Sequence, residues 1–60
     1  MKSAELIRLL EREGWVLERI KGSHPQFKHP GSRLVITVPH PRKDLKPGTL
    51  RQIMKDAGLC

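Results

Sequence analysis

The sequence predicts an α+β fold with the order helix, three strands, helix, in which both helices pack on one face of a three-stranded antiparallel sheet. Three observations predict it: apolar residues recur at helical spacing near both ends of the chain, the middle is rich in strand-forming residues, and the links between the strands are short. Hairpin-length links make neighbouring strands antiparallel. Each helix has one apolar stripe to bury, so we expect both on the same face, with the other face open to solvent.

The first helix is expected to follow Ser3, whose hydroxyl group suits an N-cap, and to end before Gly14. Glu5 lies in the first turn, where a negative charge is favourable. The buried stripe is expected to consist of the aliphatic residues Leu6, Ile7, Leu9 and Leu10.

Three strands are expected between the helices. The first is Trp15–Lys21, which ends at Gly22-Ser23, and the second is His24–His29. The turn Pro30-Gly31-Ser32 leads to the third, Leu34–Val38, which has the strongest strand-forming composition in the chain.

The second helix is expected over Pro47–Ala57, after a proline-containing loop over Pro39–Asp44. Proline suits a first helical turn, and Gly58 ends the helix. Its apolar stripe follows the spacing i, i+3, i+4 and i+7, with Leu50, Ile53, Met54 and Ala57.

The length and charge limit the possible functions. A chain of 60 residues is expected to form a single domain, residues 1–60, and it is too small for a doubly wound nucleotide-binding sheet or a barrel enzyme. It has 12 Lys and Arg against 6 Asp and Glu, a net charge of +6. Residues 1–18 contribute 3 − 4 = −1 and residues 19–55 contribute 9 − 1 = +8. This asymmetry favours a polyanion-binding surface over a merely solvated basic face.

Cysteine and hydropathy patterns indicate a soluble, cytoplasmic protein. The chain has one cysteine, Cys60, so it can form neither an internal disulfide nor a cysteine-based zinc site. No apolar run reaches the about 18 residues of a membrane span, so no membrane partner is expected. The acidic residues are scattered, so no metal or other cofactor is expected; a zinc site made only of histidines remains a minor alternative.

Residue parity on the second strand separates the candidate catalytic groups. His24, Gln26 and Lys28 share one face, whereas Phe27 and His29 share the other. Phe27 is a natural core residue, so His24 is expected on the open face. A bulge at the neighbouring proline, residue 25, would reverse this assignment, because proline cannot donate to a strand ladder.

The motif Gly22-Ser23-His24, together with the closing block Val38–Leu59 that contains Gly48-Thr49-Leu50-Arg51, resembles the HicA toxin family of toxin–antitoxin systems. The resemblance implies a double-stranded-RNA-binding-domain-like fold. It also implies a ribosome-independent mRNA endonuclease with His24 as the catalytic histidine, neutralised by a HicB-type antitoxin. Pro25 departs from the strand-forming residue that usually follows this histidine.

RNA cleavage suits so small a protein, because the 2′-hydroxyl group of RNA is the nucleophile and only proton transfer and phosphate stabilisation are needed. We therefore expect a metal-independent endoribonuclease in which His24 is the general base or acid. The basic residues expected to bind RNA are Arg19, Lys21, Lys28, Arg33 and Lys46. The alternative is a non-catalytic RNA-binding module of the same fold.

Overall fold

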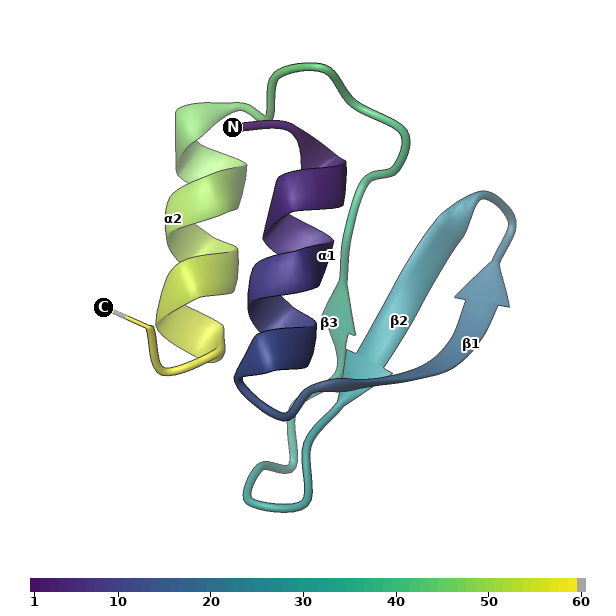
Figure 1. Ribbon diagram of the computed structural model, residues 1–60, viewed down its shortest axis with the longest axis vertical. Coiled ribbons are helices and arrows are strands. Elements are labelled where there is room, and N and C mark those ends of the chain that lie inside the picture. The colour runs from purple at the N-terminus through teal and green to yellow at the C-terminus, as the bar shows by residue number, and fades with distance from the viewer. Residues whose placement is uncertain (60) are drawn as a thin grey trace.

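The computed structural model describes residues 1–59 and has the predicted order of elements. The two helices and three strands are α1 (Ser3–Arg12), β1 (Val16–Lys21), β2 (His24–Lys28), β3 (Ile36–Thr37) and α2 (Pro47–Asp56). The strands form one antiparallel sheet in the order β1-β2-β3. Figure 1 shows α1 and α2 side by side on one face of this sheet, which confirms the predicted fold. No helix within the described residues is long and apolar enough to cross a membrane.

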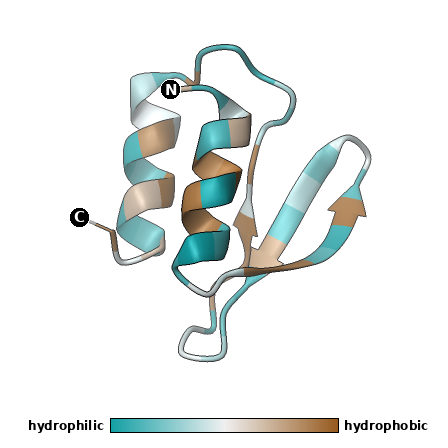
Figure 2. Ribbon diagram, in the orientation of Figure 1, coloured by the Kyte–Doolittle hydropathy of each residue, from teal (hydrophilic) through white to brown (hydrophobic). Residues whose placement is uncertain are grey.

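The core lies between the two helices and the sheet. It consists of eight hydrophobic residues with at most 6% exposure: Leu6, Leu10, Trp15, Phe27, Ile36, Val38, Leu45 and Ile53. Figure 2 shows the corresponding alternation of hydrophobic and hydrophilic segments along both helices. The predicted stripe of α2 is confirmed, since Leu50, Met54 and Ala57 pack against this core around Ile53. The stripe of α1 is confirmed at Leu6, Ile7 and Leu10, whereas Leu9 is half-buried and is not part of the core.

The start of α1 differs from the prediction. The N-cap is Lys2, and Ser3 is the first helical residue, with only 1% of its surface exposed. The Ser3 hydroxyl group does not cap the helix; it hydrogen-bonds to His40 and to the backbone of Arg42. The backbone N–H of Lys2 is instead satisfied by the carboxylate of Glu5 at 2.8 Å.

Both helices end as predicted, at glycines with positive φ. In α1 the N–H of Gly14 (φ +92°) donates to the carbonyl of Glu11, and the N–H of Trp15 donates to that of Leu10. This is a Schellman motif, which a side chain with a Cβ would strain. The end of α2 repeats it, with Gly58 (φ +74°) in the same position.

The β1–β2 hairpin turns through Gly22 and Ser23, with φ +66° at Gly22. Its irregularity lies in β1, where the register shifts at Glu18, and not at Pro25. The carbonyl of Pro25 points toward β3 and accepts the N–H of Val38 at 3.0 Å. The N–H and carbonyl of a strand residue point to the same side. An N–H on residue 25 would therefore point toward β3, at the position where the β2–β3 ladder ends. Its absence leaves the regular alternation of β2 intact.

β1 is the edge strand, and all of its residues are exposed. Figure 1 shows the β1–β2 hairpin extending sideways beyond the helices. Leu17 and Ile20 pair with Phe27 and Pro25 but stay 46% and 61% exposed, because the hairpin extends past the helix layer.

The prediction for β3 was wrong in its length. Leu34–Val38 was expected as a strand, but only Ile36 and Thr37 are in the ladder. At Leu34 the reason is the path of β2, which ends at Lys28 and turns after His29, the residue that the register would place opposite Leu34. Val35, which the register would place opposite Lys28, also lies outside the ladder, and the two residues are 47% and 48% exposed.

Candidate functional site

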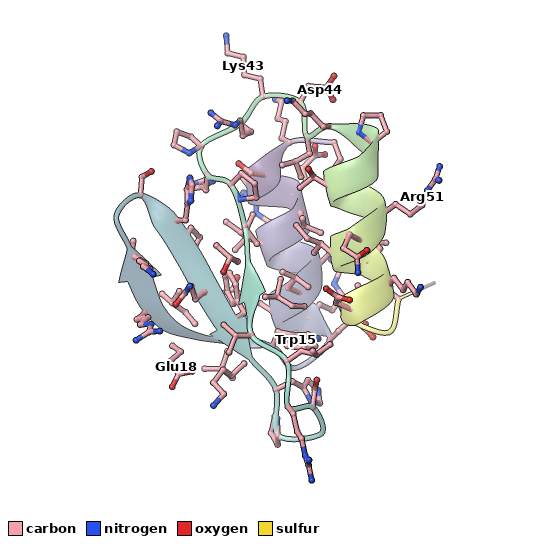
Figure 3. All side chains as sticks on the ribbon, turned by 180° about the vertical axis from the view of Figure 1, so that it is seen from behind. Trp15, Glu18, Lys43, Asp44 and Arg51 are labelled. Atoms are coloured by element: carbon pink, nitrogen blue, oxygen red, sulfur yellow. The ribbon has the colours of Figure 1, made fainter. Side chains whose placement is uncertain are left out.

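The open face of the sheet presents His24 as the parity argument predicts. Pro25 and Phe27 are buried, whereas His24 and Lys28 are exposed and Gln26 is half-buried. Lys21 is the cross-strand partner of His24 and lies on the same face. Directly opposed side chains on one face are close neighbours. An imidazole and an ammonium group therefore lie side by side at the hairpin end. Figure 3 views the molecule from this side of the sheet.

A ladder of polar side chains crosses the same face next to His24. The Nε of Arg19 on β1 donates to Oε1 of Gln26 on β2 at 2.7 Å. The Nε2 of Gln26 then donates to Oγ1 of Thr37 on β3 at 3.1 Å. This ladder holds the Arg19 guanidinium over the open face through one nitrogen, and its terminal N–H groups can still donate. Sequence reasoning missed the roles of Gln26 and Thr37, because the pairing of the three strands creates them.

The other basic residues expected to bind RNA lie elsewhere. Lys28 is four residues along β2 from His24, about 13 Å away, and its Nζ lies 3.8 Å from the carboxylate of Glu18. Arg33 is exposed in the loop after β2, at the opposite end of that strand from His24. Lys46 is at the N-cap of α2 and lines a pocket with Arg42. Only Lys21 and Arg19 are therefore neighbours of His24 in the strand pairing.

His29 has a structural role. Its Nδ1 accepts the N–H of Gly31 at 2.9 Å, so the ring proton must be on Nε2, which donates to the carbonyl of Glu13 at 3.1 Å. The ring also packs against the indole of Trp15, with 5.2 Å between the ring centroids. The indole is buried in the core with 4% exposure, so it is not a stacking platform for bases. His29 therefore links the end of α1 to the turn after β2.

His40 is also engaged in structure. Its Nδ1 lies 2.7 Å from the buried Oγ of Ser3, which in turn accepts the N–H of Arg42 at 2.9 Å. The three histidines thus occupy three separate places. Among the described residues, no three His, Cys, Asp or Glu side chains gather as metal ligands would. His24 is the histidine that the fold leaves exposed on the open face.

Such an arrangement can transfer a proton and bind a phosphate. An exposed imidazole can accept or donate a proton, and the adjacent ammonium and guanidinium groups can stabilise negative charge on phosphate oxygens. The face has room for an extended polyanion, because no helix covers it.

Comparisons with known proteins agree with this arrangement. The family described as "HicA toxin of bacterial toxin-antitoxin" matches residues 3–59. A solved structure, the "HicA3 and HicB3 toxin-antitoxin complex", contains a chain that is similar to this one, with 46% sequence identity and a TM-score of 0.86. The similarity covers 98% of this chain and 96% of that chain. A search of curated proteins found no match.

Proposed function

The chain belongs to the HicA toxin family, the toxins of bacterial toxin–antitoxin systems, and from this premise we propose that it is a metal-independent and ribosome-independent endoribonuclease. The observation that supports the proposal best is the pairing of an exposed His24 with Lys21 on the open face. Arg19 is held beside this pair by Gln26. These groups provide proton transfer and phosphate stabilisation, which RNA cleavage needs from a protein.

The proposed reaction uses the 2′-hydroxyl group of the RNA as the nucleophile. The 2′-oxygen attacks the adjacent phosphorus and loses its proton, the bond from phosphorus to the 5′-oxygen breaks, and that oxygen gains a proton. His24 carries out proton transfer in this step, and Lys21 and Arg19 stabilise the charge on the phosphate oxygens. The products are a 2′,3′-cyclic phosphate and a 5′-hydroxyl end. A single positioned imidazole contributes about 10²–10⁴-fold, so we expect a slow enzyme.

The test is cleavage of purified RNA, without ribosomes and with a chelator present. We expect wild-type protein to produce 2′,3′-cyclic phosphate ends and His24→Ala to produce none, at an unchanged melting temperature. Ser23→Ala is the matched control, because Ser23 is an exposed neighbour in the same turn. An active His24→Ala protein would exclude His24 as the catalytic residue. Salt-sensitive RNA binding without any cleavage by the wild type would indicate a binding module instead.

We also propose that a HicB-type antitoxin neutralises the toxin. The similar chain is part of a complex of HicA3 with HicB3, and the net charge of +6 favours an acidic partner. The edge strand β1 exposes Leu17 and Ile20 on one face, and such a partner would cover these apolar side chains. Growth arrest on expression of the wild type, relieved by co-expression of the antitoxin, tests this proposal.

A further inference from the structure

The loop between β3 and α2 forms a cationic pocket with the first turn of α2, apart from the open face of the sheet. The pocket has a volume of about 250 Å³ and is lined by Pro39, Arg42, Asp44, Leu45, Lys46 and Thr49. We propose that it binds a second phosphate group of the RNA strand whose cleavage we assign to His24. This inference rests on the proposed function and extends it to a second point of contact with the substrate.

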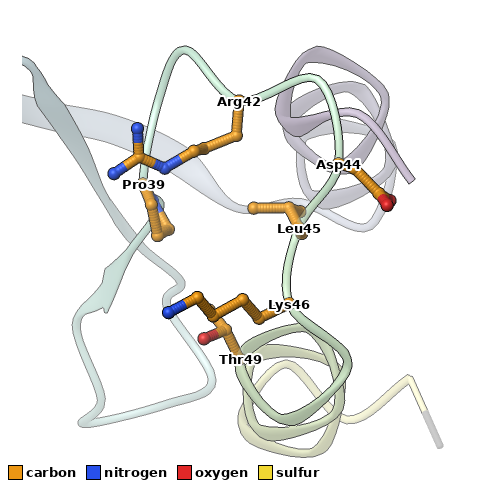
Figure 4. Close-up of a pocket in the computed structure, with 6 residues that line it drawn as sticks. All are labelled: Pro39, Arg42, Asp44, Leu45, Lys46 and Thr49. Atoms are coloured by element: carbon orange, nitrogen blue, oxygen red, sulfur yellow. The ribbon is translucent and has the colours of Figure 1, made fainter.

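The side chains of the pocket favour an anion. In Figure 4 the Arg42 and Lys46 side chains extend toward Pro39 from opposite sides of the pocket, and the Thr49 hydroxyl group lies beside the Lys46 side chain. The Asp44 carboxylate points away from the pocket. It is 88% exposed and lies 3.2 Å from the N-terminal amine of Met1. Two positive charges therefore face the pocket, and the acidic side chain at its border is paired outside it.

The backbone that carries Arg42 is fixed on both sides. Its N–H donates to Oγ of Ser3 at 2.9 Å, and its carbonyl accepts the N–H of Ser3 at 3.0 Å. Leu45 is buried in the core, and its N–H donates to the carbonyl of Met1 at 2.9 Å. The loop is therefore pre-organised, so binding an anion requires little further ordering of the backbone.

Phosphate is the ligand that this set of donors fits best. A guanidinium group can hold two oxygens of one phosphate in a bidentate pair, and an ammonium and a hydroxyl group can donate to the same group. Two segments lie at the same end of the molecule (Figure 1): the β1–β2 turn, after which β2 begins at His24, and the β3–α2 loop. The molecule measures 28 × 27 × 17 Å, so one RNA strand can reach both. A second anchor would then fix the position of the RNA relative to His24.

The first experiment measures the affinity for a fluorescent single-stranded RNA in a His24→Ala background, so that cleavage does not interfere. We expect Arg42→Gln and Lys46→Gln each to weaken binding about tenfold. Each should also reduce the slope of log affinity against log salt by about 0.7. Lys43→Gln is the matched control, because it removes one charge from the same loop but does not line the pocket. Figure 3 shows Lys43 extending outward from this loop. We expect it to weaken binding no more than about twofold.

Equal effects of the pocket variants and of Lys43→Gln would overturn the inference. So would pocket variants that weaken only antitoxin binding, which would assign the pocket to an acidic protein. A further experiment titrates the protein with inorganic phosphate and monitors the amide signals of Arg42 and Thr49. Saturable phosphate binding with unchanged RNA affinity in the pocket variants would assign the pocket to a free anion and overturn the RNA assignment. If wild-type protein fails to cleave RNA while the pocket variants still lose affinity, the nuclease proposal fails and the second phosphate site stands.

Discussion

Ser3 could cap α1, or it could act as a tether that joins the N-terminus to the β3–α2 loop by hydrogen bonds. Substitution of Ser3 distinguishes these two roles. Ser3 lies at the first position of α1 with 1% exposure, and its Oγ accepts the N–H of Arg42 and contacts Nδ1 of His40. Removing Oγ in Ser3→Ala leaves the Arg42 N–H without its partner. Both hydrogen bonds are part-buried and each is worth about 0.5–1.5 kcal/mol, so losing the contacts with Arg42 and His40 together costs about 1–3 kcal/mol.

We therefore expect Ser3→Ala to lower the free energy of unfolding by about 2 kcal/mol. For a domain of this size, that corresponds to a fall in melting temperature of about 8–16 °C. The measurement is thermal and urea unfolding followed by circular dichroism, in the His24→Ala background so that toxicity does not limit expression.

A second variant, Ser3→Gly, makes the experiment decisive. At an N-cap, glycine is nearly as good as serine and better than alanine. Inside a helix, glycine is less favourable than alanine by up to about 1 kcal/mol. The tether therefore predicts that Ser3→Gly is less stable than Ser3→Ala, and a cap predicts the reverse order. Lys2→Ser, at the observed N-cap, is the control and should leave the melting temperature unchanged or raise it. A Ser3→Gly protein more stable than Ser3→Ala would refute the tether.

Two further predictions follow from single contacts. Gly14→Ala should destabilise the protein by about 1–2 kcal/mol from the left-handed backbone alone, and more because the added Cβ would lie 2.9 Å from Nε2 of His29. Urea unfolding measures this loss; Gly48→Ala, with nothing within 4 Å of its Cβ, should show none, and equal stability of the two variants would contradict the reasoning. Gln26→Ala releases the Arg19 guanidinium and should lower kcat/KM for RNA cleavage about tenfold, with the fold intact. An unchanged cleavage rate would show that the fixed position of Arg19 is unimportant.

Much of the fold could be predicted from local patterns. Helical spacing of apolar residues and the stops at Gly14 and Gly58 identified both helices, because periodicity and left-handed backbone are short-range properties. Parity on β2 placed His24 on the other face of the sheet from the buried Phe27, and the burial pattern and pairing of the strand confirm this placement. The sequence left a bulge at Pro25 open, because proline has no N–H to donate to a ladder. Only the pairing of β2 with β3 shows where that N–H would have pointed.

The sequence by itself therefore determined the order of the elements, most of the apolar stripe of each helix, the burial of Phe27, the exposure of His24 and the excess of positive charge in residues 19–55. The tertiary structure decided how the charges are grouped. It placed Lys21 and Arg19 beside His24 and left Lys28 and Arg33 apart from it. Hydrogen bonds between Ser3 and Arg42, which lie 39 residues apart in the chain, join the start of α1 to the β3–α2 loop. The same hydrogen bonds fix the backbone of Arg42 at the pocket. Such contacts depend on how the loop folds back over α1, and no periodic or local pattern in the sequence specifies that path.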